Sequence, residues 1–346
     1  MSGRVLQLID GDEERRGRKL RAVRTLLTWA FRVAFAGMAL VLVPAAFSAA
    51  NGPSDWEGWR PGPAEAGRSA TLPFPDAIAA GREPDGVLYA CRGLVNGDMH
   101  VGRIRGDFAG CHVGYGGKEI EIKPFEVLSL SWKPAEAGPA GALVAGTEWA
   151  PGVETPFTAA SLFICRASFQ GGVHSGQARA GQKGCSFGFG GKRIVVGTYE
   201  LLQASPWLGW VPATSGNLPD SAVVSGNEGG ENFYACRAQD KNGLHPGKVK
   251  RGPIGCGIVS NGREATLDRF EVLAPRWKGG HAGTSPVGGF LAGRENGEGQ
   301  FVCRAPSRDG NRDAVQLGKV SDALGGCHVG MRGAEVVIAD YEVLSQ

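Results

Sequence analysis

Eight cysteines divide most of the chain into four repeats with nearly identical internal spacing. The two cysteines of a repeat are separated by 20, 20, 20 and 24 residues, and the second always lies 15 residues before a glutamate. Equal intervals without an insertion predict a rigid, strand-paired structure between these points. The cysteine pairs are Cys91 with Cys111, Cys165 with Cys185, Cys236 with Cys256 and Cys303 with Cys327, and the glutamates are Glu126, Glu200, Glu271 and Glu342.

Within each repeat the residue pattern is typical of β-structure. Residues 87–91 and 233–236 are short runs of β-forming residues near glycines, and residues 119–122 alternate polar and apolar side chains. Glycine is unusually frequent, at 56 of 346 residues, but shows no Gly-X-Y period. We therefore predict an all-β protein, with antiparallel β-sandwich or barrel-like domains built from paired repeats.

A second, longer symmetry predicts that neighbouring repeats fold together. The segment 56–61 resembles 207–212, and Trp132-Lys133 recurs as Trp277-Lys278 after 145 residues. We expect one repeat pair at 56–203 and another at 207–346. The individual repeats are predicted at about 77–132, 142–203, 207–277 and 287–346.

The N-terminal residues have the order of an export signal. Residues 1–32 carry eight Lys or Arg, residues 33–50 carry no charge, and small residues follow the apolar run. We expect residues 1–50 to be a cleaved signal peptide or an uncleaved membrane anchor. Either alternative predicts a secreted, periplasmic or extracellular surface location.

The charge of the remaining chain argues against nucleic-acid binding. Eight of the 37 basic and four of the 34 acidic residues lie in residues 1–32, so the rest carries 29 bases and 30 acids. A balanced surface lacks the basic patch on which nucleic-acid binding depends. We expect no nucleic-acid partner, and membrane contact only through an uncleaved anchor.

An even number of cysteines behind an export signal predicts disulfides within each pair, with free core thiols as the alternative. Close Cys-x-x-Cys doublets of the kind that bind zinc are missing from the sequence, so we predict no metal site. A bridge that closes a loop of this size contributes about 3 kcal/mol in the chain-entropy model.

The third repeat contains five short motifs in a fixed order, and the first repeat adds Tyr115-Gly116-Gly117-Lys118-Glu119. This ordered set resembles the DM9 (DM-nine) repeat family, known from insect and mollusc proteins and from natterin-like toxins. The resemblance extends over four copies. The motifs of the third repeat are Gly226-Asn227-Glu228, Tyr234-Ala235-Cys236-Arg237, Pro246-Gly247-Lys248-Val249, Gly262-Arg263-Glu264 and Phe270-Glu271-Val272-Leu273.

The resemblance implies carbohydrate-binding sites of the mannose type. Family members with two such repeats look like lectins in which an acidic residue and a turn lysine hold sugar hydroxyls. The second repeat is degenerate, because Glu148 is displaced by an insertion and Gln177 replaces the lysine, and we predict that it binds poorly. The implied sites are Glu228 with Lys248, Glu295 with Lys319, and Glu83 with Arg103.

The chemistry of such a pair is suitable for a sugar. A carboxylate accepts hydrogen bonds from two adjacent hydroxyls, an ammonium donates to their oxygens, and charge-assisted hydrogen bonds are about twice as strong as neutral ones. The alternative is a structural ion pair across two turns. An aromatic residue two positions before each first cysteine is expected to pack in the core rather than stack on a sugar: Tyr89, Phe163, Tyr234 and Phe301.

The sequence contains no His-Glu-x-x-His or phosphate-loop motif. Three functions remain open. The first is a multivalent glycan-binding protein, and the second is a structural or adhesive surface protein without a sugar site. The third is a glycoside-active enzyme that uses Glu119 or Glu264 with a second acid. We favour the first function, with glycans as the partner. We expect no enzymatic activity and no cofactor, and self-association of the chain remains open.

Overall fold

The computed structural model describes residues 58–62, 76–149, 159–282, 284, 286–309 and 312–346. These residues form 28 strands and one short 3-10 helix, and the strands pair antiparallel. The predicted all-β class is confirmed. The expected signal or anchor, residues 1–50, lies outside the described residues. No helix in the described part of the chain is long and apolar enough to span a membrane.

Each repeat contributes seven strands. Repeat 1 comprises β1 (Trp59–Pro61), β2 (Ala79–Glu83), β3 (Gly86–Val95), β4 (Asp98–Ile104), β5 (Cys111–Tyr115), β6 (Lys118–Ile122) and β7 (Phe125–Leu128). Repeat 2 comprises β8 (Trp132–Pro134), the helix η1 (Ala135–Ala137), β9 (Val144–Glu148), β10 (Ala160–Phe169), β11 (Gly172–Arg179), β12 (Cys185–Phe189), β13 (Lys192–Val196) and β14 (Glu200–Leu202).

The same order recurs in the second half of the chain. Repeat 3 comprises β15 (Leu208–Thr214), β16 (Val224–Glu228), β17 (Glu231–Asp240), β18 (Gly243–Val249), β19 (Cys256–Ser260), β20 (Arg263–Leu267) and β21 (Arg269–Pro275). Repeat 4 comprises β22 (Trp277–His281), β23 (Leu291–Glu295), β24 (Glu298–Asp309), β25 (Arg312–Val320), β26 (Cys327–Met331), β27 (Ala334–Ile338) and β28 (Asp340–Leu344).

A two-residue turn joins the fifth and sixth strands of every repeat. Both turn residues have positive φ, between 50 and 81°, which matches the tight hairpin turn that favours Gly and Asn. The residue two positions after each turn therefore occupies the same place in all four repeats. The turns are Gly116-Gly117, Gly190-Gly191, Asn261-Gly262 and Arg332-Gly333.

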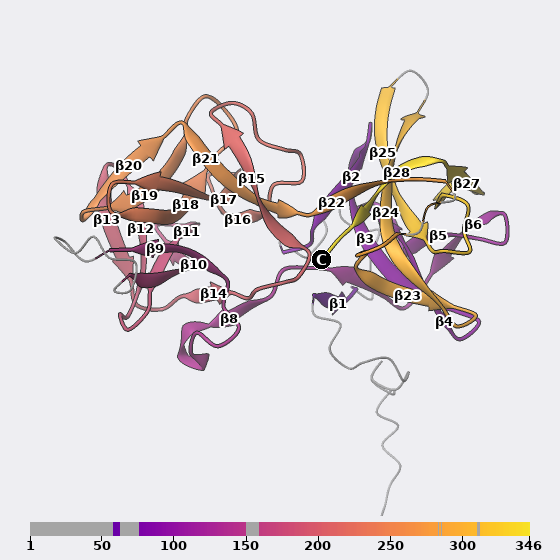
Figure 1. Cartoon of the computed structure of the whole chain (residues 1–346), viewed down its shortest axis with the longest axis horizontal. Helices are drawn as coiled ribbons and strands as arrows, with labels where there is room; N and C mark the ends of the chain where they lie inside the picture. Colours follow the sequence, from indigo (N-terminus) through magenta and orange to yellow (C-terminus); the bar gives the residue numbers. More distant parts are fainter. Residues whose placement is uncertain (1–57, 63–75, 150–158, 283, 285, 310–311) are drawn as a thin grey trace, which may run out of the picture. The chain divides into compact units, whose positions relative to one another are not determined.

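The repeats pair in a nested order, and the predicted pairing of sequence neighbours is wrong. One 14-stranded sheet combines repeats 1 and 4, and the other combines repeats 2 and 3. In Figure 1 the indigo strands of repeat 1 lie among the yellow strands of repeat 4. The repeats of a sheet join through β2–β25, β4–β23 and β6–β27, and through β16–β11, β18–β9 and β20–β13.

The longer sequence symmetry does not determine which repeats share a sheet. The similarity of 56–61 to 207–212 shows only that repeats 1 and 3 resemble each other in sequence. The edge strands of each repeat are equivalent, so any two repeats could pair by backbone hydrogen bonds. The chain passes to the second sheet after repeat 1 and returns after repeat 3.

An arginine, a glutamate and a tryptophan form the same cluster in every repeat. The arginine follows the first cysteine, and its Nε lies 2.6–2.7 Å from the glutamate of the constant 15-residue interval. Its guanidinium lies 4.3–4.5 Å from the tryptophan ring. The clusters are Arg92/Glu126/Trp59, Arg166/Glu200/Trp132, Arg237/Glu271/Trp210 and Arg304/Glu342/Trp277.

The four predicted disulfides are all present, and their eight cysteines are fully buried. Each disulfide lies in the hydrophobic cluster of its own repeat. The aromatic residue two positions before each first cysteine packs in the same cluster, as expected for a core role: Tyr89, Phe163, Tyr234 and Phe301.

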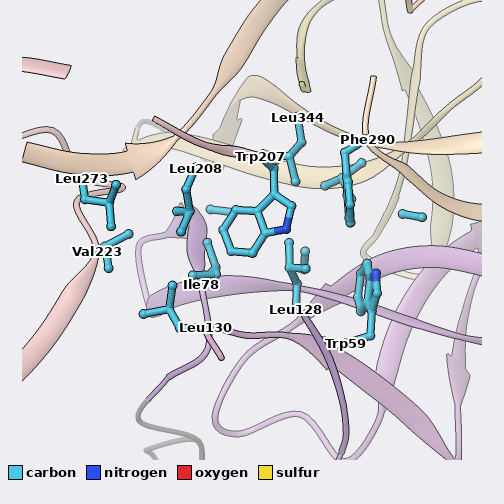
Figure 2. Close-up of a cluster of buried hydrophobic side chains, with 14 of the residues drawn as sticks. Trp59, Ile78, Leu128, Leu130, Trp207, Leu208, Val223, Leu273, Phe290 and Leu344 are labelled. Carbon is cyan, nitrogen blue, oxygen red and sulfur yellow. The ribbon is translucent and has the colours of Figure 1, made fainter. Parts of the chain in front are cut away.

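A fifth hydrophobic cluster contains residues of both sheets. Its largest fully buried side chain is Trp207, which lies next to Leu128 of repeat 1 in Figure 2, with the ring of Phe290 of repeat 4 at 6.4 Å between ring centres. Leu208 and Leu273 of repeat 3 belong to the same cluster. This shared core explains why residues 56–346 form one compact unit although they contain two sheets.

Candidate functional site

The fourth strand of each repeat places the predicted cation position, near the end of the strand, against the other repeat of its sheet. The residue at the cation position is Arg103, Gln177, Lys248 or Lys319. In each repeat it contacts a histidine or glutamine of the partner repeat, and that residue lies three positions before the partner's own cation position. The four contacts are Arg103 Nη1 to Gln316 Oε1 (3.1 Å), His245 Nδ1 to Gln177 Oε1 (3.3 Å), Lys248 Nζ to His174 Nδ1 (2.7 Å) and Lys319 Nζ to His100 Nδ1 (3.1 Å).

The histidines are therefore part of the site, which the sequence did not reveal. Burial and then the neighbouring lysine lower the pKa of His100 and of His174, so both rings are neutral near pH 7. A neutral ring can accept a hydrogen bond at Nδ1 from the lysine ammonium. Their shared position in the repeat was the only available signal. In the described part of the chain, no group of three or more His, Cys, Asp or Glu could hold a metal ion.

Glu295 and Lys319 meet directly, as the resemblance implied. Lys319 Nζ lies 3.1 Å from Glu295 Oε2, and Gln300 donates to the same carboxylate at 2.7 Å. The side chain of Lys319 is 2% exposed and that of Glu295 25% exposed. The ring of Tyr115 lies 5.6 Å from the ammonium. This site therefore has a buried cation at its floor and a partly accessible carboxylate above it.

Glu228 and Lys248 are close, but no direct hydrogen bond or ion pair joins them among the described contacts. Glu228 lies 3.9 Å from His174 Nε2 and 3.7 Å from Lys250 Nζ. Lys248 is buried with its ammonium 4.4 Å from the ring centre of Phe233. Burial lowers the pKa of Lys248 to about 8, because nearby carboxylates offset only part of the desolvation.

The pair Glu83 and Arg103 belongs to a denser network. Arg103 donates to Glu83 and Gln316 through Nη1, to Glu119 through Nη2 at 2.9 Å, and to the carbonyl oxygen of Gly330 through Nε at 2.7 Å. Glu83 accepts a further hydrogen bond from Arg105 at 2.7 Å. Four of the five guanidinium N–H groups are thus engaged within the protein, which leaves little capacity for a ligand.

The glutamate after the fifth-strand turn crosses to the partner repeat. Glu119 accepts the backbone N–H of Gly333 at 2.8 Å, Glu335 accepts that of Gly117 at 2.9 Å, and Glu264 accepts that of Gly191 at 2.7 Å. These three hydrogen bonds join the two repeats of each sheet. Repeat 2 has Arg193 at this position, so it cannot return the contact.

Glu119 is held as a carboxylate at low pH. Burial raises its pKa, but hydrogen bonds from His112 and from the backbone of Gly333, together with the positive charge of Arg103, outweigh burial and lower the pKa to about 2. A folded-state pKa below the ordinary value of 4.5 stabilises the fold above pH 4.5. This contribution is lost as the pH falls from 4.5 towards 2.

We therefore expect the thermal unfolding midpoint to fall steeply between pH 4.5 and 2, and the Glu119→Gln variant to show a shallower fall over this window. Calorimetry in a pH series measures both curves. The matched control is Glu136→Gln, at an exposed position, which should follow the wild-type curve. Parallel curves for wild type and Glu119→Gln would contradict the assigned pKa.

In repeat 2, Glu148 ends β9 just as Glu83, Glu228 and Glu295 end their strands, so the expected displacement of this glutamate is wrong. Its carboxylate pairs with Arg179 at 2.9 Å rather than with a lysine. Gln177 donates to the carbonyl oxygen of Val259 at 3.1 Å. Both side chains line a pocket of about 110 Å³ between repeats 2 and 3.

The fold and the repeated acid–base positions define a class of all-β proteins built from paired tandem repeats. The family model of the DM9 repeat matches residues 76–150, 158–264 and 228–338. These matches cover more than half of the chain, so the protein belongs to the DM9 repeat family. The number of copies in the structure is four, whereas the family model matches three overlapping regions.

The chain is also similar to a solved structure, that of the nematode sperm cell motility protein MFP2B. The two sequences are 13% identical, the match covers 83% of this chain and 97% of the other, and the TM-score is 0.18. No curated protein matches the chain.

Proposed function

We propose that the protein is a multivalent carbohydrate-binding protein of the mannose type, and that Glu228 with Lys248 and Glu295 with Lys319 hold the sugar. The observation that carries the proposal is the burial of Lys248. Its ammonium has a pKa lowered to about 8 by burial and makes no direct ion pair among the described contacts. A buried charge without a salt-bridge partner destabilises a fold, so stability alone does not account for this lysine.

A sugar would complete the contacts of this site. The side chains of Glu228 and Lys250 are about a third exposed, at 35% and 31%, and the ammonium groups of Lys250 and Lys248 both lie near the ring of Phe233. Vicinal hydroxyls can donate to the Glu228 carboxylate while their oxygens accept from an ammonium. The Glu295 and Lys319 site offers the same two groups with a shorter separation.

Two sites in one chain favour multivalent use. Lys319 belongs to the sheet of repeats 1 and 4, and Lys248 to the sheet of repeats 2 and 3. Single shallow sites are expected to bind a monosaccharide weakly, and linkage of two sites raises the avidity for a clustered glycan by a factor of about 10²–10⁴. We assign the Arg103 site to stability, because its donors are already engaged.

We further propose that the chain is not an enzyme. A glycosidase needs one carboxyl group that is protonated at working pH. The pKa of Glu119 is lowered to about 2, and Glu264 accepts a backbone hydrogen bond from the partner repeat. Glu119 therefore does not suit the role of general acid, and the Glu264 carboxylate is engaged in joining the two repeats. Four buried disulfides are consistent with an oxidising compartment, and we propose that the protein acts outside the cytosol on glycans.

The double variant Lys248→Met, Lys319→Met tests the sugar sites. We expect its retention on mannan beads to fall roughly tenfold or more, because both ammonium donors and the avidity are lost. Thermal unfolding should remain cooperative, since methionine fills a similar volume and the Glu295 carboxylate, which is 25% exposed, keeps water and Gln300 as hydrogen-bond partners. The matched control Lys133→Met, Lys278→Met removes two exposed lysines and should be retained like wild type. Equal retention of the two double variants would contradict the proposed sites and favour an adhesive role without sugar binding.

A further inference from the structure

The pocket between repeats 2 and 3 has a charge pattern opposite to that of the other three acid–base positions. In those positions a lysine or arginine is the last residue but one of the fourth strand of its repeat, and a glutamate lies two positions after the turn between the fifth and sixth strands. In repeat 2 the strand carries the neutral Gln177, and the turn is followed by the cation Arg193. Repeat 2 therefore differs at both positions: a neutral amide replaces the cation, and a cation replaces the glutamate. The site is thus changed in charge and has not simply lost one group.

The lining of this pocket is basic. Arg179, Lys183 and Arg193 contribute three positive charges against one negative charge from Glu148. Glu148 is already paired with Arg179 at 2.9 Å, so it does not neutralise the other two cations. The pocket has a volume of about 110 Å³, which suits a charged substituent better than a complete sugar ring.

Arg193 has donors available for a ligand. Its Nε donates to Ser186 Oγ at 2.8 Å, which positions the guanidinium at the pocket. Among the described residues, its terminal nitrogens have no hydrogen-bond or ion-pair partner. Two such N–H groups form a planar fork that matches the two oxygens of a carboxylate or sulfate.

The floor of the pocket is polar and fixed. Gln177 is only 8% exposed, and its amide is oriented by His245 and by the carbonyl oxygen of Val259. Ser186, at 5% exposure, lies beside it on the next strand. These groups can complement an oxyanion without adding negative charge.

We propose that this pocket binds the oxyanion substituent of an acidic sugar, a carboxylate or a sulfate ester. Repeat 2 would then be a site of different specificity rather than an inactive copy. The proposal does not depend on the neutral-sugar sites, because it uses none of their lysines.

The test measures binding of three probes by the full-length protein: an oligogalacturonate, its fully methyl-esterified form, and galactose 6-sulfate. We expect oligogalacturonate, galactose 6-sulfate or both to bind, and the neutral ester not to bind. Binding of one anion alone identifies the substituent, whereas binding of neither, or equal binding of the ester, overturns the proposal.

Variants then locate the site. Arg193→Glu should weaken binding of the anionic probe at least about tenfold, because it replaces a positive charge in the pocket by a negative one. The variant should fold, because the other repeats have a glutamate at this position: Glu119, Glu264 and Glu335. Lys192→Glu makes the same charge change at the adjacent exposed position outside the pocket lining and should leave affinity within about twofold. Equal losses in the two variants would overturn the proposal.

The Lys248→Met, Lys319→Met variant separates this proposal from the sugar sites. It should still bind the anionic probe with wild-type affinity even where retention on mannan is lost. Loss of both activities in that variant would place the anion at the lysine sites instead and overturn the assignment to repeat 2.

Discussion

Replacement of Arg103 by methionine is expected to lower the free energy of unfolding by about 3–5 kcal/mol, the usual result of removing one partner of a buried ion network. The Arg103 side chain is 4% exposed and contacts both Glu83 and Glu119, whose side chains are 10% and 11% exposed. Without the guanidinium, two poorly solvated carboxylates remain close together. The carbonyl oxygen of Gly330 in the partner repeat also loses its donor.

Urea unfolding at pH 7 measures this effect. The control Arg82→Met removes an exposed arginine that pairs with Asp220, with side chains 54% and 72% exposed, and should change stability by less than about 1 kcal/mol. A loss below about 1 kcal/mol in Arg103→Met would show that the network is not structural, and Arg103 would return as a ligand candidate.

Replacement of Trp207 by alanine is expected to lower the free energy of unfolding by a similar amount, about 3–5 kcal/mol. Trp207 is completely buried in the cluster that contains residues of both sheets, next to Phe290 at 6.4 Å between ring centres. Because this cluster connects the two sheets, the cavity should also weaken their cooperativity. The disulfides of each repeat should be unaffected, since they lie in separate clusters.

Differential scanning calorimetry distinguishes these effects. We expect a lower midpoint for Trp207→Ala, with a broadened or divided transition. The control Trp149→Ala removes a tryptophan that is 36% exposed and should leave one transition near the wild-type midpoint. An unchanged, single transition in Trp207→Ala would contradict the role of the shared cluster.

Local structure was largely predictable from the sequence. The equal cysteine–glutamate interval reflects the Arg–Glu–Trp cluster, in which Arg92 and Glu126 are paired across β3 and β7. The β-forming runs near glycines and the alternation of polar and apolar residues predicted antiparallel strands, and each disulfide closes within its repeat as expected. These features depend on contacts of short sequence separation.

The pairing of repeats was not predictable, because backbone hydrogen bonds at a sheet edge carry little sequence information. The residues that join repeats 1 and 4, such as Glu119 with Gly333, are 214 positions apart. The contacts of the candidate site that cross between repeats were likewise not predictable. Glu295 and Lys319 lie within one repeat and were found from their spacing, whereas His100, which contacts Lys319 from 219 positions away, was not.

The most direct test of the central claim, that buried lysines hold sugar hydroxyls, is an NMR titration of the side-chain ammonium groups with mannose. The account predicts that the Lys248 and Lys319 signals shift and saturate with similar dissociation constants for mannose, while the Arg103 guanidinium signals stay unchanged. Lysine signals that stay constant, at mannose concentrations that elute the protein from mannan beads, would contradict it.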